Sequence, residues 1–242
     1  AHLAMPHKKH MLTFRDTRRI SDWWTEFWLP SLSHKQVLTN ILYEDNLLVH
    51  HAVRRMDARF AAAKILKPIV VKKYRLKTAP EFLPTPVAVP ENIEKSNHPT
   101  LCLLGRLDRR KRPQIFFELA AAFPQIRFIA VGRSRDPEWN HELRRRYDSL
   151  PNLEFRGFLD QFNGDGHRKI LEKSWILVNT SAREGLPNSF LEAASYGCAI
   201  LSEVDPDGFA SRFGIHAADG DFAIGLRTLL HENLWQKRGA LG

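Results

Sequence analysis

Short apolar runs alternate with amphipathic stretches from about residue 100 to residue 231. The apolar runs predict five strands, over residues 101–104, 127–131, 153–156, 176–179 and 199–202. The amphipathic stretches predict helices over residues 113–120, 137–150, 167–173, 187–196 and 221–231. Strands that alternate with helices across short connections form a parallel sheet with helices on both faces. This part of the chain therefore predicts an α/β domain with a ligand site at the carboxyl ends of its strands.

The first 96 residues show a less regular pattern. One long helix is predicted over residues 35–55, a short strand over 62–66 and a helix over 68–74. A proline-rich stretch follows, and we expect an extended connector there because proline lacks an N–H group and restricts the residue before it. Its prolines are Pro80, Pro84, Pro86, Pro90 and Pro99. We therefore expect two domains, residues 1–96 and residues 97–242.

The composition is typical of a folded globular protein. Of the 242 residues, 43% are hydrophobic, and charges of both signs are mixed along the chain. No apolar run reaches the roughly 18 residues that a membrane-spanning helix needs. Cys102 and Cys198 lie inside short apolar runs, so we predict two buried, unpaired thiols in a reducing cytoplasm.

The net charge of +9 is compatible with three kinds of partner: nucleic acid, an anionic membrane face or an anionic small substrate. The basic residues form scattered clusters, such as 109–112 and 144–146, and do not gather in one tail. Scattered clusters are usually solvated faces of a protein. Charge alone therefore does not choose between the three partners.

Residues 183–193, with the sequence REGLPNSFLEA, place two carboxylates on either side of a predicted helix start. Pro187 marks that start, because proline suits the first turn of a helix. The free N–H groups of a first turn, together with the helix dipole, favour an anion. Glu184 comes just before the helix and Glu192 lies one to two turns inside it. The two carboxylates can therefore face different parts of one ligand.

A second segment, residues 105–111 with the sequence GRLDRRK, follows the first strand of the predicted sheet. Gly105 allows the backbone to turn tightly. Arg106 and Lys111 supply cationic donors that suit a diphosphate. The two segments together offer cations and helix N–H groups for phosphates, and carboxylates for hydroxyl groups. This mixture suits a nucleoside diphosphate joined to a sugar.

These segments resemble the motifs of retaining GT-B glycosyltransferases, above all the large family four. Residues 183–193 resemble the E-x7-E signature of that family, and residues 105–111 resemble its Gly-Arg…Lys phosphate motif. Residues 152–157 resemble the strand and turn near the donor base. Residues 197–201 resemble the Gly-x-Pro-Val-Val strand, with Ala-Ile-Leu in place of Pro-Val-Val. Each motif is weak alone, but their shared order over residues 60–230 makes the resemblance specific.

The resemblance implies a GT-B type α/β fold, with a Rossmann-like donor domain at 97–242 and a partial acceptor-side domain at 1–96. It implies sugar transfer from a nucleotide diphosphate sugar to an acceptor, with retention at the anomeric carbon and with no metal or other cofactor. Glu184 would be the catalytic residue that contacts the transferred sugar, and Glu192 would bind the ribose hydroxyls. The other implied donor-binding residues are Gly105, Arg106, Lys111, Gly157, Gly185, Leu186, Pro187, Asn188 and Ser189.

The chain departs from the family pattern in its first part. No opening strand with a glycine-rich loop is recognisable in residues 1–35, and the tail after His231 is short. We therefore expect an incomplete acceptor-side domain. The chain would then be a piece of a longer protein, a reduced protein, or a protein that a partner chain completes.

Several alternatives stay open at the level of sequence. A non-catalytic nucleotide-sugar-binding module and a nucleotide-sugar epimerase would share the same architecture. A nucleic-acid-binding protein is disfavoured, since no known module for that role is present. The acceptor could be a glycan, a lipid-linked sugar or a small molecule, which leaves peripheral membrane association open. Residues 205–207, with the sequence DPD, are predicted to form a turn and not a metal site.

Overall fold

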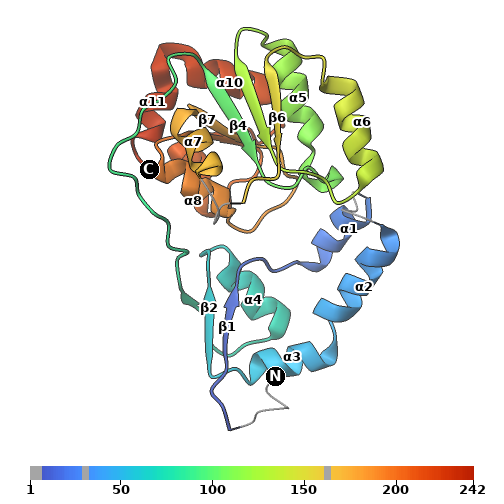
Figure 1. The fold of residues 1–242 in the computed structure, drawn as a ribbon. Coiled ribbons are helices and arrows are strands. Elements are labelled where there is room, and N and C mark those ends of the chain that lie inside the picture. The colour runs from blue at the N-terminus through green and yellow to red at the C-terminus, as the bar shows by residue number, and fades with distance from the viewer. Residues whose placement is uncertain (1–6, 29–32, 161–164) are drawn as a thin grey trace. The chain divides into compact units, whose positions relative to one another are not determined.

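The computed structural model describes residues 7–28, 33–160 and 165–242, without the side chains of Ile20 and Thr25 (Figure 1). Its contacts divide the chain into two units. The first unit comprises Ala1–Pro86 with Glu184–Leu186, and the second comprises Val87–Arg183 with Pro187–Gly242. The assignment of acceptor-side and donor domains to residues 1–96 and 97–242 stays a prediction. None of the described helices is long and apolar enough to cross a membrane.

The second unit is built on a six-stranded sheet in the order β6-β5-β4-β7-β8-β9, with every neighbouring pair parallel. The five predicted strands are confirmed to within one residue at each end, whereas β9 was not predicted. The strands are β4 (Thr100–Leu104), β5 (Arg127–Val131), β6 (Leu153–Gly157), β7 (Ile176–Asn179), β8 (Ala199–Ser202) and β9 (Gly214–His216).

Helices cover both faces of this sheet (Figure 1). Two of them, α5 and α6, lie on one face, and α7 and α8 lie on the other. This arrangement follows from right-handed crossovers, because the strand order reverses direction after β6. The helices are α5 (Pro113–Ala122), α6 (Pro137–Tyr147), α7 (Gly166–Lys173), α8 (Asn188–Ser195), α9 (Phe209–Phe213), α10 (Phe222–Leu230) and α11 (Leu234–Gly239).

A large apolar cluster packs between one face of this sheet and the helices α5, α6, α10 and α11, and a second set of buried apolar residues, among them Leu177, Ile200 and Phe190, lies on the other face. Phe116 of α5 and Phe128 of β5 are fully buried, and their ring centroids lie 5.1 Å apart. Trp175 stacks on Trp235 of α11 at 4.3 Å, which fixes the last helix beside the start of β7. Burying a large aromatic side chain removes much apolar surface from water. This cluster therefore contributes strongly to the stability of the second unit.

Both cysteines are buried and unpaired in the second unit, as predicted. Burial raises the pKa of the Cys102 thiol and that of the Cys198 thiol. The thiol of Cys198 is held among polar groups, since the Lys95 amine donates to its Sγ at 3.3 Å. The Sγ in turn donates to the carbonyls of Leu171 and Ser174. Neither thiol is exposed to reagents in the folded unit.

The proline-rich connector forms no helix between residues 80 and 99, as predicted, although it contains the short strand β3 (Glu81–Phe82). Its last part is fixed to the second unit. The Ser96 N–H donates to the Lys173 carbonyl at 3.2 Å, and Trp175 Nε1 donates to the Ser96 carbonyl at 2.7 Å. The Lys173 amine pairs with Glu94 at 2.6 Å. The connector therefore ends as an attached segment and not as a free linker.

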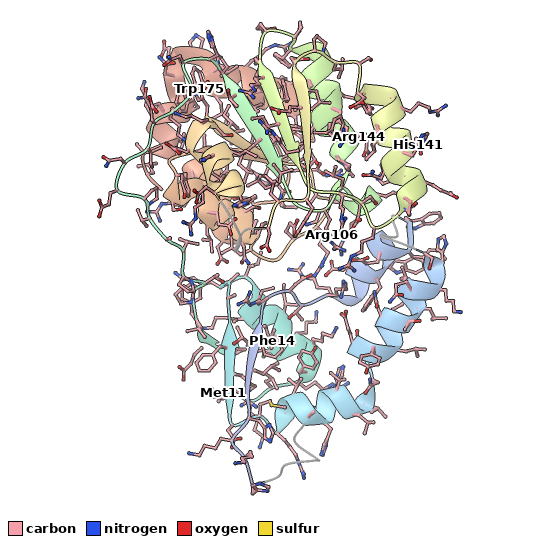
Figure 2. All side chains as sticks on the ribbon, viewed as in Figure 1. Met11, Phe14, Arg106, His141, Arg144 and Trp175 are labelled. Atoms are coloured by element: carbon pink, nitrogen blue, oxygen red, sulfur yellow. The ribbon has the colours of Figure 1, made fainter. Side chains whose placement is uncertain are left out.

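The first unit contains a three-stranded parallel sheet in the order β1-β2-β3. Phe14, at the end of β1 in Figure 2, packs with Val70 and Tyr74 in one small apolar cluster, and Ala61 and Leu66 belong to a second. The elements besides β3 are β1 (Met11–Phe14), α1 (Ile20–Trp28), α2 (His34–Glu44), α3 (Leu47–Arg54), β2 (Ala58–Ala61) and α4 (Leu66–Tyr74).

Three sequence predictions are wrong in this unit. The long helix over 35–55 is broken into α2 and α3, because the Asn46 side chain caps α3 by accepting from the Val49 N–H at 2.9 Å. The strand predicted over 62–66 lies earlier, at β2, since Leu66 already begins α4. An opening strand does exist within residues 1–35. It is β1, in which only Phe14 is buried, so the sequence shows no clear alternation there.

Candidate functional site

Three neighbouring strands of the second unit end in glycines with positive φ. Gly105 after β4 has φ 137°, Gly132 after β5 has φ 135°, and Gly157 at the end of β6 has φ 65°. A Cβ atom on Gly132 would lie 1.7 Å from the Gly105 carbonyl oxygen. The Gly132 N–H donates to the Gly157 carbonyl at 2.6 Å. At the carboxyl edge of the sheet, Gly105 and Gly157 therefore leave the backbone uncovered by side chains. Both are predicted site residues.

The side chain of Arg106 is positioned by a buried carboxylate. Arg106 Nη1 lies 3.0 Å from Asp108 Oδ2, and Asp108 is only 1% exposed. Asp108 Oδ1 also accepts from Ser134 Oγ and from the Arg135 N–H, both at 3.4 Å. A buried carboxylate needs such partners. Arg106, which is 40% exposed, is thereby held where β4 ends (Figure 2).

The segment that contains Arg106 and Lys111 is hydrogen-bonded to the segment that leads into α8. Thr180 Oγ1 donates to the Lys111 carbonyl at 2.6 Å, and the Ala182 N–H donates to the Arg110 carbonyl at 3.3 Å. Arg112 Nε donates to the Thr180 carbonyl at 2.8 Å. These contacts join positions about 70 residues apart in the sequence. Two segments that were selected independently by their chemistry are therefore neighbours in the fold.

Arg112 is a residue of this site region that the sequence did not reveal. Its φ of 46° lies in the left-handed region, which an arginine adopts at a cost. Its guanidinium pairs with Glu203 at 2.5 Å besides binding the Thr180 carbonyl. Glu203 lies after β8, and nothing local in the sequence links it to Arg112. Arg112 therefore links three loops at this edge of the sheet, namely its own after β4 and those after β7 and β8.

The helix α8 begins at Asn188, one residue later than predicted, with Pro187 at the N-cap position. Pro187 offers no side-chain acceptor to the first turn, and the Phe190 N–H donates to the Pro187 carbonyl at 3.0 Å. Asn188 and Ser189 form the first turn. This end of α8 has the backbone donors and the dipole direction that favour an anion.

Glu192 lies on α8, one turn beyond this helix start, as predicted. Its Oε2 atom is 3.7 Å from Nε2 of His167, a half-buried residue at the beginning of α7. His167 has no recognisable signature in the sequence, because a lone histidine in a short amphipathic helix has no distinctive spacing. The structure makes it the neighbour of a predicted ribose-binding carboxylate.

The remaining predicted residues, Glu184, Gly185 and Leu186, are grouped with the first unit. The second unit thus brings together Gly105, Arg106 and Lys111 with the approach to α8, and it places Glu192 on that helix. The predicted roles of Glu184 on the sugar and of Glu192 on the ribose stay predictions.

Residues 205–207 form a turn, as predicted. Pro206–Gly208 is a short 3-10 helix, and Asp207 has φ 56°. The carboxylate of Asp205 accepts from the Ser211 N–H at 3.2 Å. Throughout the described ranges, no group of three or more His, Cys, Asp or Glu side chains is arranged to hold a metal ion.

Comparison with solved structures shows the fold. The chain is similar to Anabaena Alr3699/HepE in complex with UDP and glucose, with 14% identity and a TM-score of 0.68 over 98% of this chain and 66% of that one. It is similar to sucrose-phosphate synthase from Thermosynechococcus elongatus, with 16% identity and a TM-score of 0.64 over 95% and 60%. It is also similar to the pneumococcal O-GlcNAc transferase GtfA in complex with UDP and GlcNAc, with 14% identity and a TM-score of 0.58 over 84% and 44%. These similarities confirm the predicted GT-B type fold.

The chain spans less than two thirds of each of these three proteins. No curated protein sequence matches it. A family model described as glycosyl transferases group 1 matches residues 98–230, which is more than half of the 242 residues. The matched range contains the motifs on which the predicted resemblance depends. The chain therefore belongs to the glycosyl transferases group 1 family.

Proposed function

We propose that this protein transfers a sugar from a nucleotide diphosphate sugar to an acceptor, with retention of the anomeric configuration. In this reaction the bond between the anomeric carbon and the phosphate oxygen breaks, and a bond to the acceptor oxygen forms. The acceptor loses its proton, and the nucleoside diphosphate leaves with added negative charge. A site for this reaction has to bind a diphosphate and stabilise that charge.

One observation carries the proposal. The loop with Arg106 and Lys111 is hydrogen-bonded through Thr180 and Ala182 to the segment that leads into α8. Two cationic side chains and a helix N-terminus consequently belong to one edge of one sheet. Cations and backbone N–H groups together are a common solution for binding phosphates. This arrangement supports a donor site that neutralises the diphosphate without a metal ion.

We assign the remaining roles by residue. Glu192 accepts hydrogen bonds from the ribose hydroxyls, and Glu184 contacts hydroxyls of the transferred sugar. Gly105 and Gly157 allow the donor to approach the backbone closely. UDP is the first nucleotide to test, since HepE and GtfA were both solved with UDP.

The test is calorimetric titration of UDP, GDP and ADP, and of their common sugar conjugates, into the full chain. Each charge-assisted hydrogen bond contributes about 1.5–3 kcal/mol. We therefore expect Arg106→Ala/Lys111→Ala to weaken binding of the preferred nucleotide by at least ~100-fold, at about 1.4 kcal/mol per tenfold. The matched control is Arg145→Ala/Arg146→Ala, which removes two exposed cations from α6.

Binding that falls equally in both double variants would contradict the proposed donor site. Turnover is tested separately with candidate acceptors, and the anomeric configuration of the product is determined by proton NMR. We expect Glu184→Gln to lower kcat far more than it weakens donor binding. Donor binding without transfer would instead support a non-catalytic binding module, and an epimerised nucleotide sugar would support the epimerase alternative.

A further inference from the structure

The first unit contains a cavity of about 630 Å³ whose lining is strongly basic. It is formed by the chain after β1, by the junction of α2 and α3, and by one side of α4. Figure 1 shows α1, α2 and α3 following one another, with α3 next to α4. The charged lining residues are Arg18, Arg19, Lys72, Lys73, Arg75 and the carboxylate Asp45.

Two of these cations form a fixed inner wall. Arg18 pairs with Glu26 at 3.3 Å and with Glu44, and its guanidinium lies over the Trp23 ring at 4.9 Å. The Lys73 amine donates to Asp45 Oδ2 at 2.9 Å. Their charges are therefore largely matched by carboxylates of the same unit, and their side chains are held in place.

Asp45 is the centre of this wall. Besides Lys73, Trp23 Nε1 donates to it at 3.1 Å, and His50 Nε2 lies 3.0 Å from its Oδ1. Burial alone would raise the pKa of Asp45, but the hydrogen bonds from Lys73, His50 and Trp23 outweigh it and lower that pKa. The only lining carboxylate is thus fully engaged by the wall and does not neutralise the other cations of the cavity.

The other three cations, Arg19, Lys72 and Arg75, form the exposed rim. Across the ranges that the structure describes, no hydrogen bond or ion pair engages any of these three side chains. A second cavity of about 530 Å³ adjoins the first, with His50, Lys73 and Arg75 lining both. It adds His51 and Arg54, so the basic surface continues along α3.

Like charges gathered around one cavity repel each other and lower stability unless an anion joins them. Arginine and lysine side chains are the usual partners of phosphate groups, since several donors can address one group. A cavity of this size accommodates a phosphate ester together with part of the molecule that carries it. Neither donor-site segment contributes to this lining.

We propose that this cavity binds a phosphate group of the acceptor substrate, through Arg19, Lys72 and Arg75. The identity of the ligand as an acceptor substrate rests on the proposed transferase function, whereas phosphate binding by the cavity does not. The same chemistry could come from a soluble phosphate ester or from a lipid headgroup. The test distinguishes these two sources.

The binding test uses inorganic phosphate at constant ionic strength, added to the full chain in an Arg106→Ala/Lys111→Ala background. That background removes phosphate binding by the donor site. We expect phosphate to raise the Tm, and Lys72→Gln/Arg75→Gln to weaken phosphate binding at least tenfold. The matched control is Lys8→Gln/Lys9→Gln, which removes two exposed cations of the same unit that do not line the cavity.

A second arm uses vesicles of phosphatidylcholine alone and with one quarter phosphatidylglycerol. Binding to the anionic vesicles that Lys72→Gln/Arg75→Gln abolishes would support a lipid headgroup as the source. Phosphate binding without vesicle binding would support a soluble phosphate ester. Equal losses in the cavity variant and the Lys8→Gln/Lys9→Gln control, or no binding of either probe, would overturn the proposal. Nucleotide titration in Lys72→Gln/Arg75→Gln, with Arg106 and Lys111 intact, tests the donor site independently.

Discussion

The two units bury different kinds of side chain. The second unit packs apolar side chains on both faces of its six-stranded sheet, and the large cluster on one face contains the fully buried Phe116, Phe128 and Leu201. Among the residues that the structure describes, the first unit has two small apolar clusters, a half-buried polar network around Asp45 and the buried carboxylate of Glu26 at 4% exposure. Large apolar side chains of its helices, such as Trp28 and Leu47, are exposed.

This difference has an energetic meaning. Apolar burial contributes in proportion to the area removed from water, and neighbouring contacts compensate in part when one is lost. A network of buried charges contributes little net stability when complete, but losing one partner leaves another unsatisfied. The second unit should therefore respond to changes in volume, and the first to changes in charge.

The largest expected effect is that of Phe116→Ala. Removing a fully buried Phe from a large core costs about 3–5 kcal/mol. Phe14→Ala in the first unit should cost less, because its cluster is small and can collapse around the missing ring. Hydrogen exchange followed by mass spectrometry reports the opening of each unit. Equal losses of protection at both sites would contradict the contrast drawn between the two units.

Neutralising a single carboxylate should destabilise the first unit more than the second. Asp45→Asn weakens the hydrogen bonds from Lys73, Trp23 and His50, at an expected cost of about 1–3 kcal/mol near pH 7. The pKa of Asp45 is lowered in the folded state, so its contribution is present above the unfolded pKa of about 3.9 and is lost as pH falls through the folded value.

The difference between wild type and Asp45→Asn should thus shrink below about pH 4. It is measured as the free energy of opening of the first unit, by hydrogen exchange at several pH values. The control is Asp148→Asn, whose exposed carboxylate pairs only with Arg144 at i−4 among the described residues. A pH-independent difference would show that Asp45 acts through packing and not through its charge.

The smallest expected effect is a change in donor binding by the second unit when His167 is replaced. His167 Nε2 lies 3.7 Å from Glu192 Oε2, beyond hydrogen-bond distance but within the range of an ion pair when the imidazole is protonated. We expect His167→Gln to raise the donor KM about two- to fivefold, equivalent to roughly 0.5–1 kcal/mol, with kcat nearly unchanged. A purely structural role would lower stability instead. A donor with 2′,3′-dideoxyribose should show no difference between variant and wild type.

The fold of the second unit could be predicted because its strands are short, nearly continuous apolar runs between amphipathic helical stretches. Residues 127–131, 176–179 and 199–202 were placed correctly for this reason. The first unit gave no such signal. In β1 only Phe14 is buried, and the break between α2 and α3 depends on one side-chain cap by Asn46.

The candidate site was predictable in its local parts and not in its long-range parts. Gly105, Arg106 and Lys111 follow a strand, and the sequence shows that directly. The pairing of Arg112 with Glu203 joins residues 91 positions apart, and the approach of His167 to Glu192 depends on how α7 and α8 pack. Such pairs have no sequence spacing of their own, so only the tertiary structure reveals them.

The two buried thiols have a practical consequence. They are the only cysteines of the chain, and both lie in the second unit, one in β4 and the other just before β8. A reagent that alkylates thiols can react with Cys102 or Cys198 only after that unit opens, since burial also keeps both thiols protonated. The first unit contains no cysteine, so it contributes nothing to the alkylation that is measured. The rate of alkylation under native conditions therefore measures how often the second unit opens, with no need to introduce a cysteine.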